Sequence, residues 1–247
     1  MQQRTFDRIE KKFLLTQMQK DFLVEEIQKY LTYDPHIINE KPYHIYNLYY
    51  DTNDFSFIRR SLNKPTYKEK IRLRTYSYPL KNDDTVFLEI KKKYRGRINK
   101  RRIVMTYESF GNYLNDQYCP NEDDYLNKQI YEEINYLLTR NHLQPKAYIA
   151  YERLAFHNDD DTLRVTFDHN IRFKTDEVSL KDENTHHILE DESEWLMEIK
   201  STQNFPFWLV QLLSEHRIYA KSFSKYGKAY EQFITGGYYE NKFITHS

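Results

Sequence analysis

The sequence is poor in the residues that crosslink folds and interrupt regular structure. Its 247 residues include one cysteine, Cys119, with five glycines and seven prolines. A single cysteine excludes an intrachain disulfide framework, which suits a reducing compartment. No Gly/Ser-rich tract, Pro-rich tract or repeat of fixed period interrupts the chain, so nothing in it reads as a linker or a solenoid. We therefore expect one compact domain over residues 1–247.

The sequence also lacks a long hydrophobic run and an excess of either charge. No apolar stretch approaches the roughly 18 residues that span a bilayer, and the polar start MQQRTFDRIEKK is not a signal peptide. Lys+Arg and Asp+Glu are equal at 37 each, so the whole chain has no electrostatic attraction for nucleic acid or anionic membranes. We expect a cytoplasmic protein without a nucleic-acid partner; a membrane-bound partner is compatible with this composition. Any specificity for anions must be local.

Tyrosine is abundant, with 23 residues, and tyrosine favours strands. Short turn signals, such as Lys81–Asp84 and Asn158–Asp161, separate several strand-like runs and predict antiparallel hairpins. Eight runs are expected to form strands: 8–14, 44–50, 67–76, 85–93, 98–107, 147–156, 163–172 and 195–200.

Helical spacing fills the longer gaps between these runs. Thr16–Gln19 has the spacing of a capping box and leads into an apolar stripe that ends at Leu31. Apolar periodicity also predicts helices at 122–140 and 206–217, and a short helix at 224–233. The polar, acid-rich segment 174–194 is expected to be a long surface excursion. Antiparallel strands with helices packed against them make this an α+β chain.

Charged residues lie on one face of these strands. In KEKIRLRTY (68–76), four cations share one face, while Ile71 and Leu73 share the other. Alternation gives the same kind of face to Glu89, Lys91 and Lys93, to Glu198 and Lys200, to Arg164, Thr166 and Asp168, to Arg8, Glu10 and Lys12, and to Tyr151 and Arg153. Solvent exposure would explain the charged face of any one strand. Together, the predominance of Arg and Lys favours a charged face that lines the inside of a curved sheet.

Eight strands can close into a barrel wide enough for side chains or one ligand. A lumen lined by lysine and arginine is unstable when empty, because buried like charges are costly unless they are paired. A polyanion would resolve this repulsion, and arginine and lysine both suit phosphate. Carboxylates on the same face are hard oxygen ligands for Mg²⁺ or Mn²⁺. The residues therefore predict an eight-stranded antiparallel β-barrel forming a polar tunnel for metal–triphosphate, with helices packed outside.

The same runs resemble a known family. RIEKKF, YYDT, KIRLRTY, LEIKKKYRGRINKRR, YERLAF, LRVTFD, LMEIK and SFSKYGKAY, in this order, are similar to the VTC domain. This domain is the polyphosphate polymerase branch of the triphosphate tunnel metalloenzymes, also called the CYTH-like superfamily. The resemblance implies a tunnel barrel that uses ATP and a divalent metal, often Mn²⁺, to extend inorganic polyphosphate or pyrophosphate.

The resemblance also implies roles for individual residues. Lys12, Lys91 and Glu198 would be catalytic, and the metal ligands would be Glu198, Glu10 and Glu89. Weaker candidates for binding phosphate are Lys70, Lys93 and Arg102. ATP and phosphate would be bound by Arg72, Arg74, Lys91, Lys100, Arg153, Arg164, Lys200, Ser224 and Lys225. The terminal phosphate of the chain would attack the γ-phosphorus of ATP and needs no general base, since it is already ionised.

Two departures from the family are visible. Arg8-Ile-Glu10-Lys-Lys12 stands where the hydrolase and cyclase branches have Glu-x-Glu-x-Lys, which favours the polymerase branch. No SPX regulatory domain or transmembrane helix fits in this chain, so it resembles a stand-alone bacterial type. Two alternatives stay open: a hydrolase of tripolyphosphate or nucleoside triphosphate with the same fold, and a non-catalytic polyphosphate sensor.

Overall fold

The computed structural model describes residues 5–6, 9–95, 97–116, 124–175, 177–181, 187–188 and 194–231. Arg8, Cys119 and the end of the 224–233 segment lie outside these residues, as do parts of 174–194. Within the described residues, no helix is long and apolar enough to cross a membrane.

All eight predicted strands are present. The strands are β1 (Thr5–Phe6), β2 (Ile9–Thr16), β3 (Thr32–Tyr33), β4 (Tyr43–Asp51), β5 (Tyr67–Thr75), β6 (Thr85–Tyr94), β7 (Arg97–Thr106), β8 (Gln144–His157), β9 (Leu163–Lys174), β10 (His187–Ile188) and β11 (Glu194–Ser201). The unpredicted β1, β3 and β10 have two residues each. Such short strands carry no alternation that a sequence pattern could reveal.

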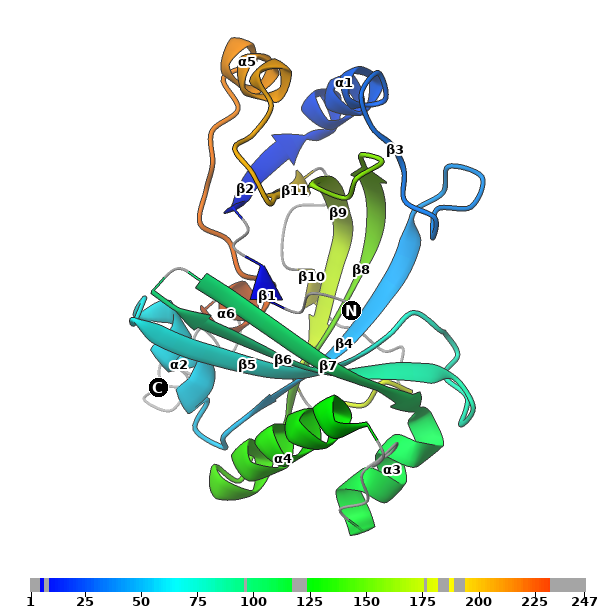
Figure 1. Cartoon of the computed structure of the whole chain (residues 1–247), viewed down its shortest axis with the longest axis vertical. Coiled ribbons are helices and arrows are strands. Elements are labelled where there is room, and N and C mark those ends of the chain that lie inside the picture. Colours follow the sequence, from blue (N-terminus) through cyan, green and yellow to red (C-terminus); the bar gives the residue numbers. More distant parts are fainter. Residues whose placement is uncertain are drawn as a thin grey trace, which may run out of the picture.

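The strands form one antiparallel sheet in the order β1-β7-β6-β5-β4-β8-β9-β11-β2, with β10 beside β9 and β3 beside β8. The predicted hairpins β5–β6, β6–β7 and β8–β9 are confirmed. The sheet curls strongly, so that its two halves face each other across a central space (Figure 1).

The sheet does not close into the predicted eight-stranded barrel. Among the described residues, β2 pairs with β11 and β7 pairs with β6 and β1, but no ladder joins β2 to β7. Side chains reach across the open seam instead, since Lys91 of β6 lies 3.4 Å from Glu10 of β2. Strand alternation shows which face is polar, but it does not show whether the two end strands exchange backbone hydrogen bonds.

Six helices are described: α1 (Gln17–Ile27), α2 (Ser56–Leu62), α3 (Tyr107–Asp116), α4 (Tyr125–Arg140), α5 (Phe207–Glu215) and α6 (Lys225–Ala229). The capping box of α1 is confirmed, because Thr16 Oγ accepts from Gln19 N and Gln19 Oε1 accepts from Thr16 N. The predicted helices at 122–140, 206–217 and 224–233 correspond to α4, α5 and α6.

Helices α2 and α3 were not predicted. Helix α2 begins after Phe55, which has a left-handed φ of 59° and makes no side-chain cap. Its first amides donate instead to Asp51, from Phe57 N at 2.9 Å and from Ile58 N at 3.0 Å. Because this cap comes from the end of β4, no capping signal is adjacent to the helix.

Four helices cover the outer face of the sheet in two groups. Helix α6 instead brings Lys225 to the inner face, beside Asp168 and Glu198, so the prediction that the helices pack outside is confirmed only in part. Helices α3 and α4 lie over β5, β6 and β7, and α1 and α5 lie over β2 and β11 (Figure 1). Ile71 and Leu73 are buried beneath the first group, as their position opposite the cations predicts. Leu180 is also buried in that cluster, so segment 174–194 is not wholly a surface excursion.

Candidate functional site

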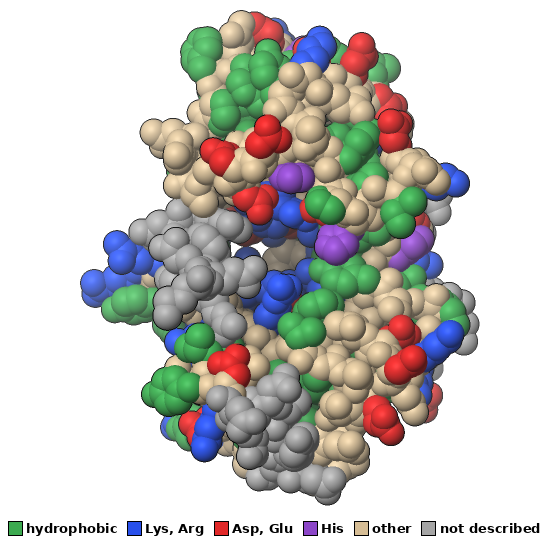
Figure 2. Space-filling model, turned by 45° about the vertical axis from the view of Figure 1, so that its right-hand side comes forward, with side chains coloured by type: hydrophobic (Ala, Val, Ile, Leu, Met, Phe, Trp, Pro, Cys, Tyr) green, Lys and Arg blue, Asp and Glu red, His purple; other side chains and the backbone are tan. Residues whose placement is uncertain are grey.

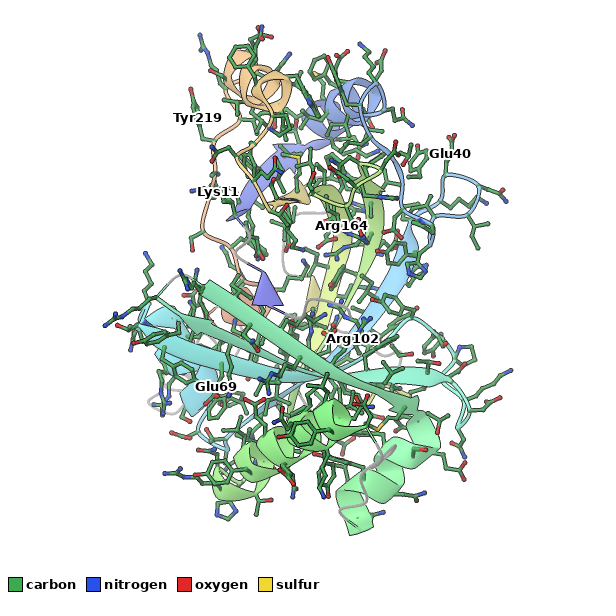
Figure 3. The ribbon with its side chains drawn as sticks, viewed as in Figure 1. Lys11, Glu40, Glu69, Arg102, Arg164 and Tyr219 are labelled. Carbon is green, nitrogen blue, oxygen red and sulfur yellow. The ribbon has the colours of Figure 1, made fainter. Side chains whose placement is uncertain are left out.

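The concave face of the curled sheet gathers the charged side chains that alternation had assigned to it. Figure 2 shows Lys and Arg side chains around a hollow at the middle of the molecule, and Figure 3 shows Arg164 and Arg102 on opposite sides of the same space. We call this hollow the tunnel. Its charged residues belong to β2, β5, β6, β7, β8, β9, β11 and α6, and form three clusters, each centred on a carboxylate.

The first cluster surrounds Glu89 of β6, which is 2% exposed. Arg72 Nε donates to its Oε2 at 2.7 Å, and Lys100 of β7 pairs with its Oε1. Burial would raise the pKa of Glu89, yet Arg72, Arg74 and Lys100 hold it well below its usual range. Burial is also the main cause that lowers the pKa of Lys100 to about 8. Glu89 is therefore an ionised anchor for two cations.

The second cluster surrounds Asp168 of β9, which has no exposed surface. Arg153 donates two hydrogen bonds to it, Nε to Oδ1 at 2.6 Å and NH2 to Oδ2 at 2.8 Å, and Lys225 of α6 also donates to Oδ2. Tyr151 lies beside them, with the Lys225 ammonium 4.3 Å from its ring centre. Burial would raise the pKa of Tyr151, but Arg74, Arg153 and Lys225 lower it to about 8.

The third cluster surrounds Glu198 of β11. Lys200 lies 3.0 Å, Lys12 3.3 Å and Lys225 3.6 Å from its carboxylate oxygens. Lys12 is also 3.6 Å from Glu10, so one ammonium lies near two carboxylates. Burial would raise the pKa of Glu198, but these lysines hold it well below its usual range. Glu198 is shared between the second and third clusters through Lys225.

Three further cations have other partners. Arg164 pairs with buried Asp34. Arg74 donates to Asn47 Oδ1 at 2.9 Å and to the Tyr151 hydroxyl at 3.2 Å. Lys70 donates to Ser224 Oγ at 3.0 Å. Neither Arg74 nor Lys70 forms an ion pair with a carboxylate of the described residues.

The carboxylates fit a divalent cation only in part. Nowhere in the described ranges do three His, Cys, Asp or Glu side chains gather as a metal group. Glu10 and Glu198 lie on either side of Lys12, and the buried Thr166 hydroxyl, opposite Glu198 on β9, has no hydrogen-bond partner. These oxygens suit Mg²⁺ or Mn²⁺, which need few protein ligands when phosphate and water supply the rest. Glu89 has a cation at each oxygen, Arg72 and Lys100, and Glu198 likewise has lysines at both of its oxygens, so a metal at either carboxylate would have to displace a cation.

An aromatic cluster lies at one end of the same inner face. Tyr76 lies just past the end of β5, two residues after Arg74, and its ring stacks on His36 at 6.0 Å and lies 5.6 Å from Phe87 of β6. Tyr43 lies 5.9 Å from Tyr76, and the Arg102 guanidinium lies over Phe87 at 5.1 Å. Tyr76 is 41% exposed. We call these residues the aromatic mouth.

The structure places every predicted site residue on or beside this inner face, including Ser224 at the start of α6. It separates Glu89 from the other predicted metal ligands. The sequence reasoning missed Asn47 and Tyr49, whose places in the alternation of β4 could have revealed them. It also missed Asp34 and the aromatic mouth. Asp34 and His36 lie in irregular segments, where no strand or helix pattern points to the tunnel.

Comparisons with known proteins identify a family model and solved structures that resemble this chain. The model of the family described as VTC domain matches residues 7–234. No curated protein matches the chain. A candidate adenylate cyclase from Bacillus halodurans has a similar structure, with a TM-score of 0.54 and 12% identity over 90% of this chain and 96% of that one. Another, from Vibrio parahaemolyticus, has a TM-score of 0.45 and 10% identity over 90% of this chain and 96% of that one.

Proposed function

This chain belongs to the VTC domain family, and we propose that it is an ATP-dependent polyphosphate polymerase. It transfers the γ-phosphate of ATP to a growing inorganic polyphosphate chain inside the tunnel, with the help of Mn²⁺ or Mg²⁺. The observation that carries the proposal is the three-cluster arrangement of cations on one concave face. Phosphoryl transfer needs positioning and charge neutralisation more than covalent chemistry, and this face supplies both.

The clusters explain how so many cations coexist without substrate. Glu89, Asp168 and Glu198 each hold two or more cations, so arginines and lysines are fixed before a ligand arrives. Fixed donors lose little conformational entropy on binding, and arginine presents a planar fork to phosphate oxygens. We assign the triphosphate of ATP to Arg72, Arg74, Arg153 and Arg164, with Lys100, Lys200, Ser224 and Lys225 around it.

Glu198 and Glu10 are the residues that would hold the metal, with Thr166 beside them. A divalent ion there would neutralise phosphate charge as it moves to the leaving group. Lys12 and Lys91 stand next to these carboxylates and would orient the terminal phosphate of the acceptor. That phosphate is ionised at neutral pH, so the attack on the γ-phosphorus requires no base from the protein.

The function is tested by incubating the purified chain with ATP and Mn²⁺ and separating the products on a gel that resolves polyphosphate. Acid-labile polymer together with ADP is the expected result. Release of free phosphate without polymer would show a hydrolase, and binding of polyphosphate without turnover would show a sensor. The same reaction with EDTA in place of Mn²⁺ is the control for metal dependence.

The aromatic mouth gives a prediction about the nucleoside. Tyr76 is an exposed ring that can stack on adenine at the end of the Arg72 and Arg74 row. Base stacking contributes about 1–3 kcal/mol, so Tyr76→Ala should raise the Kd for ATP by about tenfold. Binding of tripolyphosphate, which has no base, should change less than about twofold. Isothermal titration with both ligands measures the difference, and equal losses for the two would contradict a role in stacking.

A further inference from the structure

Lys70 differs from the other lysines and arginines of the tunnel in its electrostatic surroundings. It is half-buried, and its Nζ atom donates to Ser224 Oγ, the cap of α6. After burial, the groups that lower its pKa most are cations: Lys12 from β2, Lys91 from β6, and Lys68 and Arg72 from its own strand. A cation in such a place is stable only when an anion joins it.

Lys70 belongs to a row of lysines at one end of the inner face. Lys68 precedes it in the alternation of β5 and lies opposite Lys93 of β6, while Lys70 lies opposite Lys91. Lys68 donates to the Ser61 carbonyl oxygen at 3.2 Å, and Lys93 is exposed. Neither pairs with a carboxylate of the described residues. The row leads from the carboxylate clusters to solvent.

The lysine row and the aromatic mouth lie at opposite ends of the same two strands. Along β5, the inner-facing residues run from Lys68 through Arg72 to Arg74, with Tyr76 just past the end of the strand, and along β6 they run from Lys93 to Phe87. The six-residue rise from Lys68 to Arg74 spans about 20 Å of extended chain. The inner face thus has one end suited to a nucleoside and one end that offers only positive charge.

We propose that Lys70, with Lys68 and Lys93 beside it, is the subsite for the acceptor, a linear inorganic polyphosphate whose own charge supplies the missing anion. This inference rests on the proposed function, since it assigns the second substrate to the same tunnel. Fixed ion pairs suit a triphosphate of defined length. Lysines without carboxylates suit a chain that must slide outward as it grows, because they attract it and add no repelling charge.

The protonation of Lys70 should change when the chain binds. Burial and the neighbouring cations lower the pKa of Lys70 to about 7, so much of the amine is neutral in the empty tunnel near neutral pH. Phosphate favours the ammonium form and raises that pKa, so binding takes up a proton. The affinity for polyphosphate should therefore fall as pH rises above about 7 and level off below it.

The test is isothermal titration of metal-free protein with a short inorganic polyphosphate, and separately with ATP, in buffers of different ionisation enthalpy. Lys70→Met should weaken polyphosphate binding by about tenfold, the loss expected for a charge-assisted bond. ATP binding should change less than about threefold. Lys70→Arg should restore the affinity without the part of the proton uptake that Lys70 causes, because arginine stays charged.

Lys11→Met is the matched control. Lys11 is an exposed lysine of β2, one residue from Lys12, and its alternation places it away from the tunnel. Lys100 and Tyr151, whose pKa values lie near 8, are present in wild type, Lys70→Met and the control alike, so the difference in proton uptake between wild type and Lys70→Met reports Lys70. Polyphosphate binding that is equal in wild type and Lys70→Met overturns the subsite alone. A wild type that binds no polyphosphate overturns the proposed function as well.

Discussion

Replacing Glu198 by glutamine is expected to abolish metal-dependent polymer formation while the tunnel still binds triphosphate. Glutamine keeps the shape of the side chain but removes the ionised oxygen that a divalent cation requires. Glu198 also neutralises Lys12, Lys200 and Lys225, all within 3.6 Å of its carboxylate. Without that charge, the three lysines attract phosphate more strongly. We expect turnover with Mn²⁺ to fall by about 100-fold or more and metal-free tripolyphosphate affinity to hold or rise.

The contrast between the two readouts is what makes this substitution informative. Turnover is measured by the polymer gel, and metal-free binding is measured by isothermal titration in EDTA. Glu69→Gln is the matched control, because Glu69 is a glutamate of β5 on the outer side of the sheet, where it accepts from the Tyr67 hydroxyl. Full activity of Glu198→Gln would remove Glu198 from the metal site. Loss of both activity and binding would indicate a folding defect instead.

Strand alternation predicted which residues line the tunnel, because each side chain of a strand points to one of the two faces of the sheet. Once Ile71 and Leu73 are assigned to the core, Arg72 and Arg74 must point the other way. The same reasoning placed Lys91, Arg153, Arg164 and Glu198 on the inner face.

The ion pairs within the tunnel could not be predicted from the sequence, because they depend on how the sheet curls. Arg72 meets Glu89 on a neighbouring strand, but Lys91 meets Glu10 only because β6 and β2 approach across the seam. A pattern in one strand cannot fix that distance. The cations around the predicted metal ligands are of this kind, with Arg72 and Lys100 at Glu89 and three lysines at Glu198.

Residues in irregular segments were missed for a different reason. Asp34 holds Arg164 from the stretch between β3 and β4, and His36 joins the aromatic mouth from the same stretch. Neither position belongs to a repeating pattern, so nothing local shows that it contacts the tunnel. The Asp51 cap of α2 is similar, because the carboxylate and the amides that it accepts from are five or more residues apart.

Replacing Asp168 by asparagine is expected to cause the largest loss of stability among these substitutions. Asp168 is fully buried and holds Arg153 by two bonds and Lys225 by one. Asparagine would leave Arg153 without its paired anion and Lys225 with Glu198 alone, and breaking such a buried pair costs about 3–5 kcal/mol. Urea unfolding followed by circular dichroism measures this loss as a lower midpoint. Asp160→Asn, an exposed turn aspartate that accepts from Thr162, is the control.

Acid and polyanions should both reduce the difference in stability between wild type and Asp168→Asn. Burial would raise the pKa of Asp168, but Arg153 and Lys225 hold it below its usual value. Its contribution to stability is therefore complete above the unfolded carboxyl pKa of about 4 and is lost as pH falls through the lower folded pKa. Added tripolyphosphate should stabilise the variant more than the wild type, because phosphate replaces the missing charge beside Arg153 and Lys225. Equal stabilisation of both proteins would mean that these two cations do not contact the ligand.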